Sequence, residues 1–310
     1  MTAPLYNDLA EGPADGRALW LTTPDRVRIR VAIWNAGGPA GTVFVLPGRT
    51  EYVEKYGRTA TDLAAAGFAT LCIDWRGQGL SDRALPDAMV GHVTDFAEYQ
   101  TDLDMAVGFA RAENLPQPFY LMPHSMGGCI GLRSLTRDLP FQAAAFSAPM
   151  WGILMADALR PVAGALATAS RWFGFHHHYA PGTNARTYVL AAPFADNTLT
   201  SDPDMWDYMR RQALAHPDLS LGGPSYGWLK AALDECAALA RLPSPATPTI
   251  TALGSRERIV DTRPIHTRMA RWPGGRLDLH PGAEHEVLME KPAIRHAFTQ
   301  SAIQLFNENR

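Results

Sequence analysis

The hydrophobic and polar positions of the chain follow two periods, which predict alternating strands and helices. Short apolar runs rich in β-branched residues predict buried strands, whereas apolar positions three or four residues apart predict helices. We expect strands at 17–22, 26–34, 42–46, 68–73, 119–122, 143–147, 249–253 and 276–280. We expect helices at 51–66, 95–112, 125–136, 228–242, 260–272 and 291–307. After an antiparallel hairpin at 17–34, this alternation predicts an α/β fold with a mostly parallel sheet covered by helices on both faces.

The alternation stops after Pro149. Residues 150–227 carry helix and loop signals but no convincing strand, and they are rich in Trp, Phe, Met and Ala. We therefore expect a core formed by 1–149 and 228–310, interrupted by a mostly helical cap at 150–227. The apolar stretch 151–175 of this cap fits two roles, packing on the core or contact with an acyl chain or a membrane surface, and both remain open.

One predicted strand ends abruptly in His124-Ser125-Met126-Gly127, where a helical pattern begins. Such a strand–turn–helix junction exposes a serine at its tip and points the first N–H groups of the helix toward the atom that the hydroxyl attacks. The nucleophile elbow of α/β-hydrolases reads G-x-S-x-G, and here Pro123 takes the first glycine position. This pattern also fits an ordinary turn, so the rest of the chain has to decide.

Two later strand ends supply an acid and a base for Ser125. Glu257 and Asp261 follow the strand at 249–253, and His285 follows the strand at 276–280. A serine hydroxyl needs a base to take its proton, and the base needs a carboxylate to orient it. Because the carboxyl ends of parallel strands share one edge of a sheet, we assign Ser125 as nucleophile, His285 as base and Glu257 as orienting acid. Asp261 competes with Glu257, but we expect it to cap the helix that follows.

Composition and charge exclude several classes of protein. The chain has 310 residues, 46% of them hydrophobic, enough for one large α/β domain with an insertion. A formal net charge of −3 without basic blocks argues against a nucleic-acid partner. Cys72, Cys129 and Cys236 form no C-x-x-C pair and are expected to be buried free thiols. Since we find neither a signal-like N-terminus nor a long apolar run, we expect a cytoplasmic protein.

The sequence predicts no metal and no cofactor. The adjacent histidines His176, His177 and His178 cannot all point at one ion, and no His-Glu-x-x-His motif occurs. The pair Gly77 and Gly79 is too short for a dinucleotide-binding loop, and no phosphate-binding Gly-x-x-x-x-Gly-Lys motif is present. We therefore expect chemistry carried by side chains alone.

Several stretches resemble one known family when they are taken in order. They are 46–52, 74–81, 124–128, 254–261 and 283–290 in the core, with 199–202 and 223–228 in the cap. Together they are similar to the bacterial lysophospholipases and monoacylglycerol lipases of the α/β-hydrolase superfamily. The resemblance covers nearly the whole chain and implies an α/β-hydrolase fold with an eight-stranded sheet and a helical cap.

The resemblance also implies roles for individual residues. The family's oxyanion loop reads His-Gly-x-x-Glu; here Pro47 replaces the histidine while Gly48 and Glu51 keep their places. The backbone N–H groups of Arg49 and Met126 are then expected to bind the oxyanion. Glu257 stands where the family most often has Asp, and the turn 74–81 is expected to be scaffold.

We expect the substrate pocket to include Glu51, Met150, Trp151 and Tyr226. The resemblance implies a serine hydrolase that cleaves carboxylic esters through an acyl-enzyme, with a lysophospholipid or monoacylglycerol as substrate. A general short-chain carboxylesterase and a catalytically silent binding protein on the same fold remain alternatives. The expected partners are a small-molecule or lipid ester and, transiently through the cap, a membrane surface. The sequence gives no indication of oligomeric state.

Overall fold

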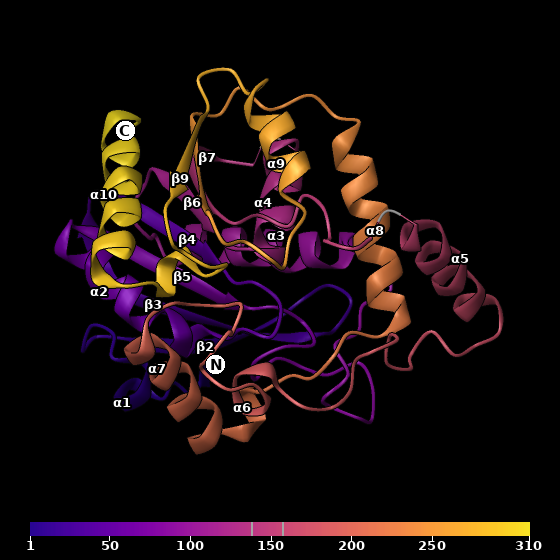
Figure 1. The fold of residues 1–310 in the computed structure, drawn as a ribbon. Helices are drawn as coiled ribbons and strands as arrows, with labels where there is room; N and C mark the ends of the chain where they lie inside the picture. The colour runs from indigo at the N-terminus through magenta and orange to yellow at the C-terminus, as the bar shows by residue number, and fades with distance from the viewer. Residues whose placement is uncertain (138, 157) are drawn as a thin grey trace.

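The chain is organised around one mixed β-sheet (Figure 1). The computed structural model describes residues 1–137, 139–156 and 158–310. Within them the sheet has nine strands in the order β1-β2-β3-β5-β4-β6-β7-β8-β9. The strands are β1 (Thr2–Ala3), β2 (Arg17–Thr22), β3 (Arg28–Pro39), β4 (Thr42–Leu46), β5 (Phe68–Asp74), β6 (Phe119–Pro123), β7 (Phe141–Ser147), β8 (Thr249–Gly254) and β9 (Arg276–His280).

The described helices connect and cover these strands. They are α1 (Asn7–Ala10), α2 (Gly57–Ala65), α3 (Ala97–Ala112), α4 (Met126–Leu135), α5 (Leu159–Trp172), α6 (Tyr188–Ala191), α7 (Pro203–Ala215), α8 (Tyr226–Ala240), α9 (Thr262–Met269) and α10 (Pro292–Glu308). Three short 3-10 helices are η1 (Val53–Tyr56), η2 (Pro217–Leu219) and η3 (Val287–Met289).

The sheet is parallel from β5 through β4 to β9, and the pairs β1–β2, β2–β3 and β3–β5 are antiparallel. The predicted α/β fold and opening hairpin are therefore confirmed. The expected count of eight strands is one too low, because β1 adds a ninth strand that pairs Thr2 and Ala3 with β2. Two residues are too short a stretch to show a period of their own.

Alternate residues of the central strands point into two apolar layers. In β4, Phe44 and Leu46 pack into the layer that contains residues of α3, α4, α8 and α9, whereas Val43 and Val45 face the layer with α2 and α10. Both layers are fully shielded at these positions, which explains why the strands read as continuous apolar runs. This double burial holds the carboxyl ends of β4, β6, β8 and β9 in fixed positions.

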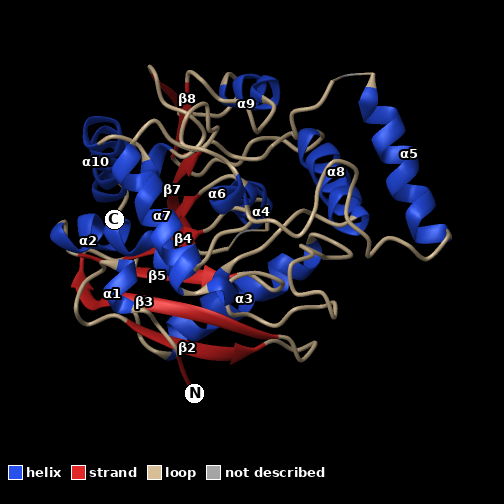
Figure 2. Ribbon diagram, turned by 60° about the horizontal axis from the view of Figure 1, so that its bottom comes forward, coloured by secondary structure: helices blue, strands red, loops and turns tan. Residues whose placement is uncertain are grey.

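The described part of 150–227 contains α5, α6, α7 and η2 and no strand longer than an isolated bridge. Helix α5 lies beyond α8 at the outer edge of the molecule in both views (Figures 1 and 2). Helix α7 lies against the N-terminal segment, where the Tyr208 hydroxyl donates to the carbonyl of Ala10 at 2.7 Å. None of the helices that the structure describes has the length and hydrophobicity needed to cross a lipid bilayer.

Candidate active site

Ser125 lies in the sharp turn between β6 and α4 with φ 49° and ψ −116°. A positive φ at a residue with a side chain costs about 1–3 kcal/mol, so neighbouring contacts must hold it. The Ser125 N–H donates to the carbonyl of Ser147 at 3.0 Å. Its carbonyl accepts from the N–H groups of Gly128 and Met150, both at 2.8 Å. Three backbone hydrogen bonds thus fix the strained turn at the carboxyl end of β6.

Two glycines let α4 approach the sheet closely enough for this turn. A Cβ on Gly127 would lie 2.1 Å from the carbonyl oxygen of Leu46, and one on Gly128 would lie 2.5 Å from Cβ of Pro149. Both distances are impossible for a real side chain without movement of the backbone. The replacement of the first motif glycine by Pro123 leaves the turn intact.

His285 and Glu257 meet at the neighbouring strand ends. Nδ1 of His285 lies 2.7 Å from Oε2 of Glu257. The other carboxylate oxygen of Glu257 accepts from the N–H groups of Ile259 at 2.6 Å and Val260 at 3.0 Å. Asp261 instead caps α9, where its side chain accepts from the N–H of Arg263. The structure therefore pairs Glu257, and not Asp261, with His285.

This pair shifts the pKa of both partners. Burial lowers the pKa of His285, but the charge and hydrogen bond of Glu257, with smaller effects of Glu286 and Glu51, outweigh it and raise the pKa above its usual value. Burial raises the pKa of Glu257, but the charge and hydrogen bond of His285, with the two backbone donors, lower it overall. The geometry thus favours a carboxylate beside an imidazole that readily accepts a proton.

Ser125 and His285 line the same cavity, which has a volume of about 610 Å³. Among the described residues no direct hydrogen bond joins the Ser125 hydroxyl to His285. Catalytic hydrogen bonds are often long without substrate and tighten in the complex. Arg49, Met150 and Trp228 also line this cavity.

The loop after β4 lies beside Ser125, because Leu46 at the end of β4 pairs with Pro123 at the end of β6. Within the described chain, the backbone N–H groups of Arg49 and Met126 donate to no protein acceptor. Met126 is the first residue of α4, so its N–H has no acceptor within the helix. Two free donors therefore lie on either side of the nucleophile's turn.

Side chains from the next loop shape this oxyanion loop. The Trp75 indole N–H donates to the carbonyl of Pro47 at 2.9 Å, and the Gln78 amide donates to that of Gly48 at 2.9 Å. Glu51 accepts from the Gly48 N–H. These contacts hold the loop although Pro47 replaces the usual histidine, and they give the turn 74–81 the scaffold role expected from the sequence.

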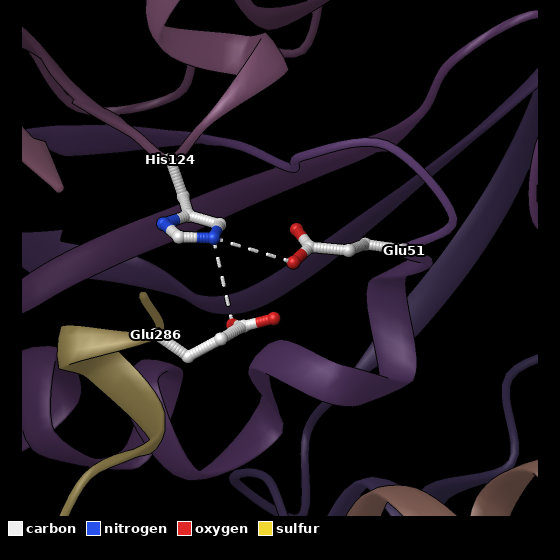
Figure 3. Close-up of side chains that lie close together, drawn as sticks. All are labelled: Glu51, His124 and Glu286. Atoms are coloured by element: carbon white, nitrogen blue, oxygen red, sulfur yellow. Dashed lines mark ion pairs between the residues drawn. The ribbon is translucent and has the colours of Figure 1, made fainter. Parts of the chain in front are cut away.

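A buried ionic cluster, formed by Glu51, Lys55, His124 and Glu286, lies behind His285 (Figure 3 shows three of its members). The Lys55 ammonium is 2.6 Å from Oε1 of Glu51 and 2.6 Å from Oε1 of Glu286. Nε2 of His124 lies 3.6 Å from Glu51 and 3.5 Å from Glu286. The rings of His124 and His285 are 4.8 Å apart between centroids, so the cluster adjoins the proposed base.

One proton in this cluster can be placed by its hydrogen bonds. Nδ1 of His124 is 3.1 Å from the carbonyl of Ser147, and since a carbonyl only accepts, Nδ1 carries the hydrogen and Nε2 a lone pair. Burial lowers the pKa of His124 to about 3, which keeps the ring neutral. Burial, opposed by Lys55 and supported by Glu51, raises the pKa of Glu286 to about 7.

Glu51, His124 and Glu286 could also be considered as metal ligands, since their ligand atoms lie within 4.8 Å of one another. The Lys55 ammonium, however, already bonds to both carboxylates. The Lys55 ammonium thus already supplies the positive charge that a metal ion would bring to these two carboxylates. Sequence reasoning missed this cluster, although Lys55 four residues after Glu51 on a predicted helix was a usable signal.

Residues of the segment 150–227 hold the loop that carries His285. The His285 N–H donates to the carbonyl of Thr198 at 3.3 Å, and the Glu286 N–H donates to that of Leu199 at 2.8 Å. The Ser201 hydroxyl donates to Glu290 at 2.6 Å. The motif 199–202 was noticed in the sequence without a role, and the structure assigns it to anchoring this loop.

The expected pocket residues separate into two groups. Glu51 and Met150 line the cavity. Trp151 lies in the core instead, stacked on Trp272 with centroids 6.0 Å apart, because its indole N–H donates to the carbonyl of Gly128. Tyr226 begins α8 and packs edge-on against Phe175. Both aromatic side chains therefore lie outside the cavity lining.

The parallel sheet, the strained serine turn and the acid and base at the next strand ends define an α/β-hydrolase. Comparison with known families agrees with this class. The family described as serine aminopeptidase, S33, matches residues 37–292, and the chain belongs to that family.

Individual relatives and structures extend the comparison. Lysophospholipase L2 of Escherichia coli strain K12 is 34% identical over 301 residues, covering 93% of this chain and 86% of that protein. The probable lysophospholipase L2 of Haemophilus influenzae is 28% identical over 267 residues, covering 86% of this chain and 83% of that protein. A soluble variant of monoglyceride lipase from Saccharomyces cerevisiae, solved with a substrate analog, shares the fold with a TM-score of 0.72, 16% identity and 94% of each chain covered.

Proposed function

We propose that Ser125, His285 and Glu257 form the catalytic triad of an enzyme that cleaves carboxylic esters through an acyl-enzyme intermediate. The observation that carries this assignment is the 2.7 Å contact of His285 with Glu257 in the cavity that Ser125 also lines. The lysophospholipase relatives support ester hydrolysis by this chain. An enzyme built on these contacts is a carboxylic ester hydrolase.

The reaction follows from the positions of the donors and acceptors. Nε2 of His285 takes the proton of the Ser125 hydroxyl as the oxygen attacks the ester carbonyl, while Glu257 stabilises the imidazolium. The N–H groups of Arg49 and Met126 bind the oxyanion, and loss of one such donor typically costs about 10² to 10³ in rate. His285 then protonates the leaving alcohol. Water activated by the same imidazole hydrolyses the acyl-enzyme.

The substrate is a lysophospholipid or a monoacylglycerol. Both have a single acyl chain, and a cavity of about 610 Å³ is within the usual range for a ligand of this size. Apolar side chains such as Met150, Val189 and Leu229 line this cavity beside Ser125. The relatives named lysophospholipase support the first of the two substrates.

A fluorophosphonate probe tests the triad directly. The probe is expected to label the wild-type protein at Ser125 and to leave Ser125→Ala unlabelled. Hydrolysis of p-nitrophenyl esters with increasing chain length tests the substrate class. A wild-type protein that does not label contradicts the enzyme assignment and favours a silent binding protein, whereas a preference for two to four carbons favours a short-chain esterase.

The description of the family as serine aminopeptidases favours a second candidate, amide hydrolysis. The same triad can attack an amide if His285 protonates the leaving amine. Amino-acid p-nitroanilides compared with p-nitrophenyl esters separate the two activities. We expect the esters to be cleaved much faster, and the reverse order would assign the chain to peptide chemistry.

The segment 150–227 acts as the cap over this cavity, and its helix α5 contacts the lipid surface that presents the substrate. Trp172 and Phe173 at the end of α5 are 85% and 79% exposed, and aromatic side chains favour the membrane interface. Co-sedimentation with anionic phospholipid vesicles is expected for the wild type and reduced for the double variant Trp172→Ser, Phe173→Ser. Equal sedimentation of the two proteins would remove α5 from the contact.

A cytoplasmic location remains part of the proposal. Cys72, Cys129 and Cys236 are buried free thiols, as expected for a protein of a reducing compartment. Fractionation of cells that produce the untagged chain tests this expectation, and recovery from the periplasm would contradict it.

A further inference from the structure

The Arg49 guanidinium lines the cavity without a carboxylate partner. Its Nη2 donates to the carbonyl of Gly222 at 2.5 Å, and its centre lies 5.3 Å from the Trp228 ring. Its Nε is shielded from solvent and makes no hydrogen bond. Across the described residues, no carboxylate lies within ion-pair distance of this guanidinium. A shielded cation with an unused donor is costly unless an anion completes it.

The buried cations of the described chain, Arg30, Lys55 and Arg76, each contact two or more carboxylates. Arg30 contacts Glu54 and Asp74, both at 2.7 Å. Arg76 contacts Asp25, Glu98 and Asp102, and Lys55 contacts Glu51 and Glu286. The fold thus neutralises its buried positive charges elsewhere. Arg49 is an exception at the edge of the cavity.

Arg83 and Arg268 also lack carboxylate partners among the described residues, and both donate to backbone carbonyls outside the cavity. Nη1 of Arg83 is shielded without a hydrogen bond, as Nε of Arg49 is. Arg83 donates to the carbonyls of Gly79 at 2.8 Å and Asp218 at 3.3 Å. Arg268 donates to carbonyls at the end of α8, where a cation is favoured by the helix dipole. Neither side chain lines the cavity, so of these three arginines only Arg49 is placed to meet a ligand there.

The cavity wall around Arg49 retains a positive charge. Burial lowers the pKa of Arg49 to about 10, so the guanidinium is still charged at neutral pH. The cavity's two carboxylates, Glu51 and Glu286, already share the Lys55 ammonium. A second arginine, Arg186, also lines the cavity. An anionic substrate group therefore gains more from this wall than a neutral group does.

We propose that the Arg49 side chain binds the phosphate of a monoacyl phospholipid whose ester carbonyl lies at Ser125. The proposal rests on the proposed ester hydrolysis and deepens it, because it selects a phosphate-bearing lipid over a neutral monoacylglycerol. Arg49 and Ser125 line the same cavity, so an ester at Ser125 and a phosphate at Arg49 belong to one bound molecule. In a lysophospholipid only the three-carbon glycerol unit separates the acyl ester from the phosphate. A planar guanidinium is suited to bidentate phosphate binding.

The ratio of kcat/KM for a lysophospholipid to that for a monoacylglycerol with the same acyl chain tests this assignment. A hydrogen bond to a charged group contributes about 1.5–3 kcal/mol, so Arg49→Gln is expected to lower the ratio about 10- to 150-fold. Arg49→Lys keeps the charge, so its ratio is expected to lie between those of the wild type and Arg49→Gln. Arg83→Gln is the matched control and leaves the ratio unchanged. An unchanged ratio in Arg49→Gln overturns the proposal, and a wild type that cleaves neither lipid instead refutes the proposed function.

Equilibrium binding covers the case in which Arg49→Gln is too slow to assay. Ser125→Ala is expected to bind the lysophospholipid more tightly than the monoacylglycerol, and Ser125→Ala with Arg49→Gln is expected to lose that preference. sn-Glycerol 3-phosphate and inorganic phosphate, as competitors, separate a lipid head group from a free anion. Stronger competition by glycerol phosphate supports the head group. A preference that survives the loss of Arg49, or competition by inorganic phosphate alone, overturns the assignment.

Discussion

Nδ1 of His285 lies 2.7 Å from Oε2 of Glu257, and the second oxygen of Glu257 is held by two backbone N–H groups. This arrangement fixes both the tautomer and the direction of the imidazole, because Nδ1 carries the hydrogen and Nε2 is left to accept a proton. The Glu257 side chain is one methylene longer than the aspartate expected at this position from the family resemblance, and the turn after β8 accommodates that length.

Replacing Glu257 with Gln is expected to lower kcat/KM about 10³- to 10⁴-fold, because the amide no longer stabilises the imidazolium. Steady-state hydrolysis of a p-nitrophenyl ester measures the loss. Asp261→Asn is the control, since Asn also caps a helix, and it is expected to stay within a few-fold of wild type. A large loss in Asp261→Asn with little change in Glu257→Gln would exchange the two roles.

The same pair predicts how stability depends on pH. The raised pKa of His285 contributes stability below its unfolded value of 6.5, which is lost as pH rises through the folded pKa. The lowered pKa of Glu257 contributes stability above 4.5, which is lost as pH falls through its folded pKa. Urea unfolding should therefore show the largest deficit of Glu257→Gln between pH 4.5 and 6.5. A deficit independent of pH would contradict the charge pairing.

The cluster behind His285 predicts a shift of the pH–rate profile. Glu286 helps to raise the pKa of His285, so Glu286→Gln is expected to move the acid limb of kcat/KM to lower pH. Glu284→Gln is a matched control, because the Glu284 side chain faces Arg256 and Arg258. Its acid limb should match that of the wild type. A shift to higher pH in Glu286→Gln would show that the buried carboxyl does not act through charge.

Removing the shared ammonium should destabilise the fold. Lys55→Met leaves the Glu51 and Glu286 carboxylates buried side by side, and breaking a buried pair typically costs about 3–5 kcal/mol. The double variant Lys55→Met, Glu286→Gln removes one of the two charges and should recover part of the loss. Urea denaturation of the three proteins measures both effects. Equal stability of the single and double variants would argue against repulsion between the carboxylates.

The close approach of α4 to the sheet makes Gly127→Ala a strong test of the turn. Its Cβ would lie 2.1 Å from the carbonyl oxygen of Leu46, so the helix must move and the fluorophosphonate rate at Ser125 should fall. Gly108→Ala is the control, because the space around Gly108 on α3 is open. That variant should be more stable by about 0.5–1 kcal/mol with unchanged labelling. Normal labelling of Gly127→Ala would mean that the backbone relaxes freely.

Much of the fold could be predicted from the sequence because the strands are buried on both faces. Each of the eight expected strand ranges overlaps an observed strand, and three of them, 17–22, 42–46 and 276–280, agree at both ends. Because the carboxyl ends of parallel strands share one edge of a sheet, Glu257 and His285 could be predicted to lie close together although they follow different strands. What the pattern could not supply was β1, whose two residues carry no period.

Contacts between distant residues were also beyond the sequence. Lys55 and Glu286 are separated by 231 positions, and no local spacing joins them. Trp151 was expected in the pocket, but its side chain lies in the core, where it stacks on Trp272. The lack of a carboxylate partner for Arg49 among the described residues is a property of its surroundings, which only the structure reveals.

The hydrogen bonds from His285 and Glu286 to Thr198 and Leu199 tie the proposed general base to the segment 150–227, the proposed lid. A lid that swung open at this point would carry the imidazole away from its serine, so an open molecule would be an inactive one. The bonds therefore couple the position of the proposed base to a segment that also lines the cavity. In such an open molecule without substrate, water that enters the cavity would not meet His285 in position beside Ser125.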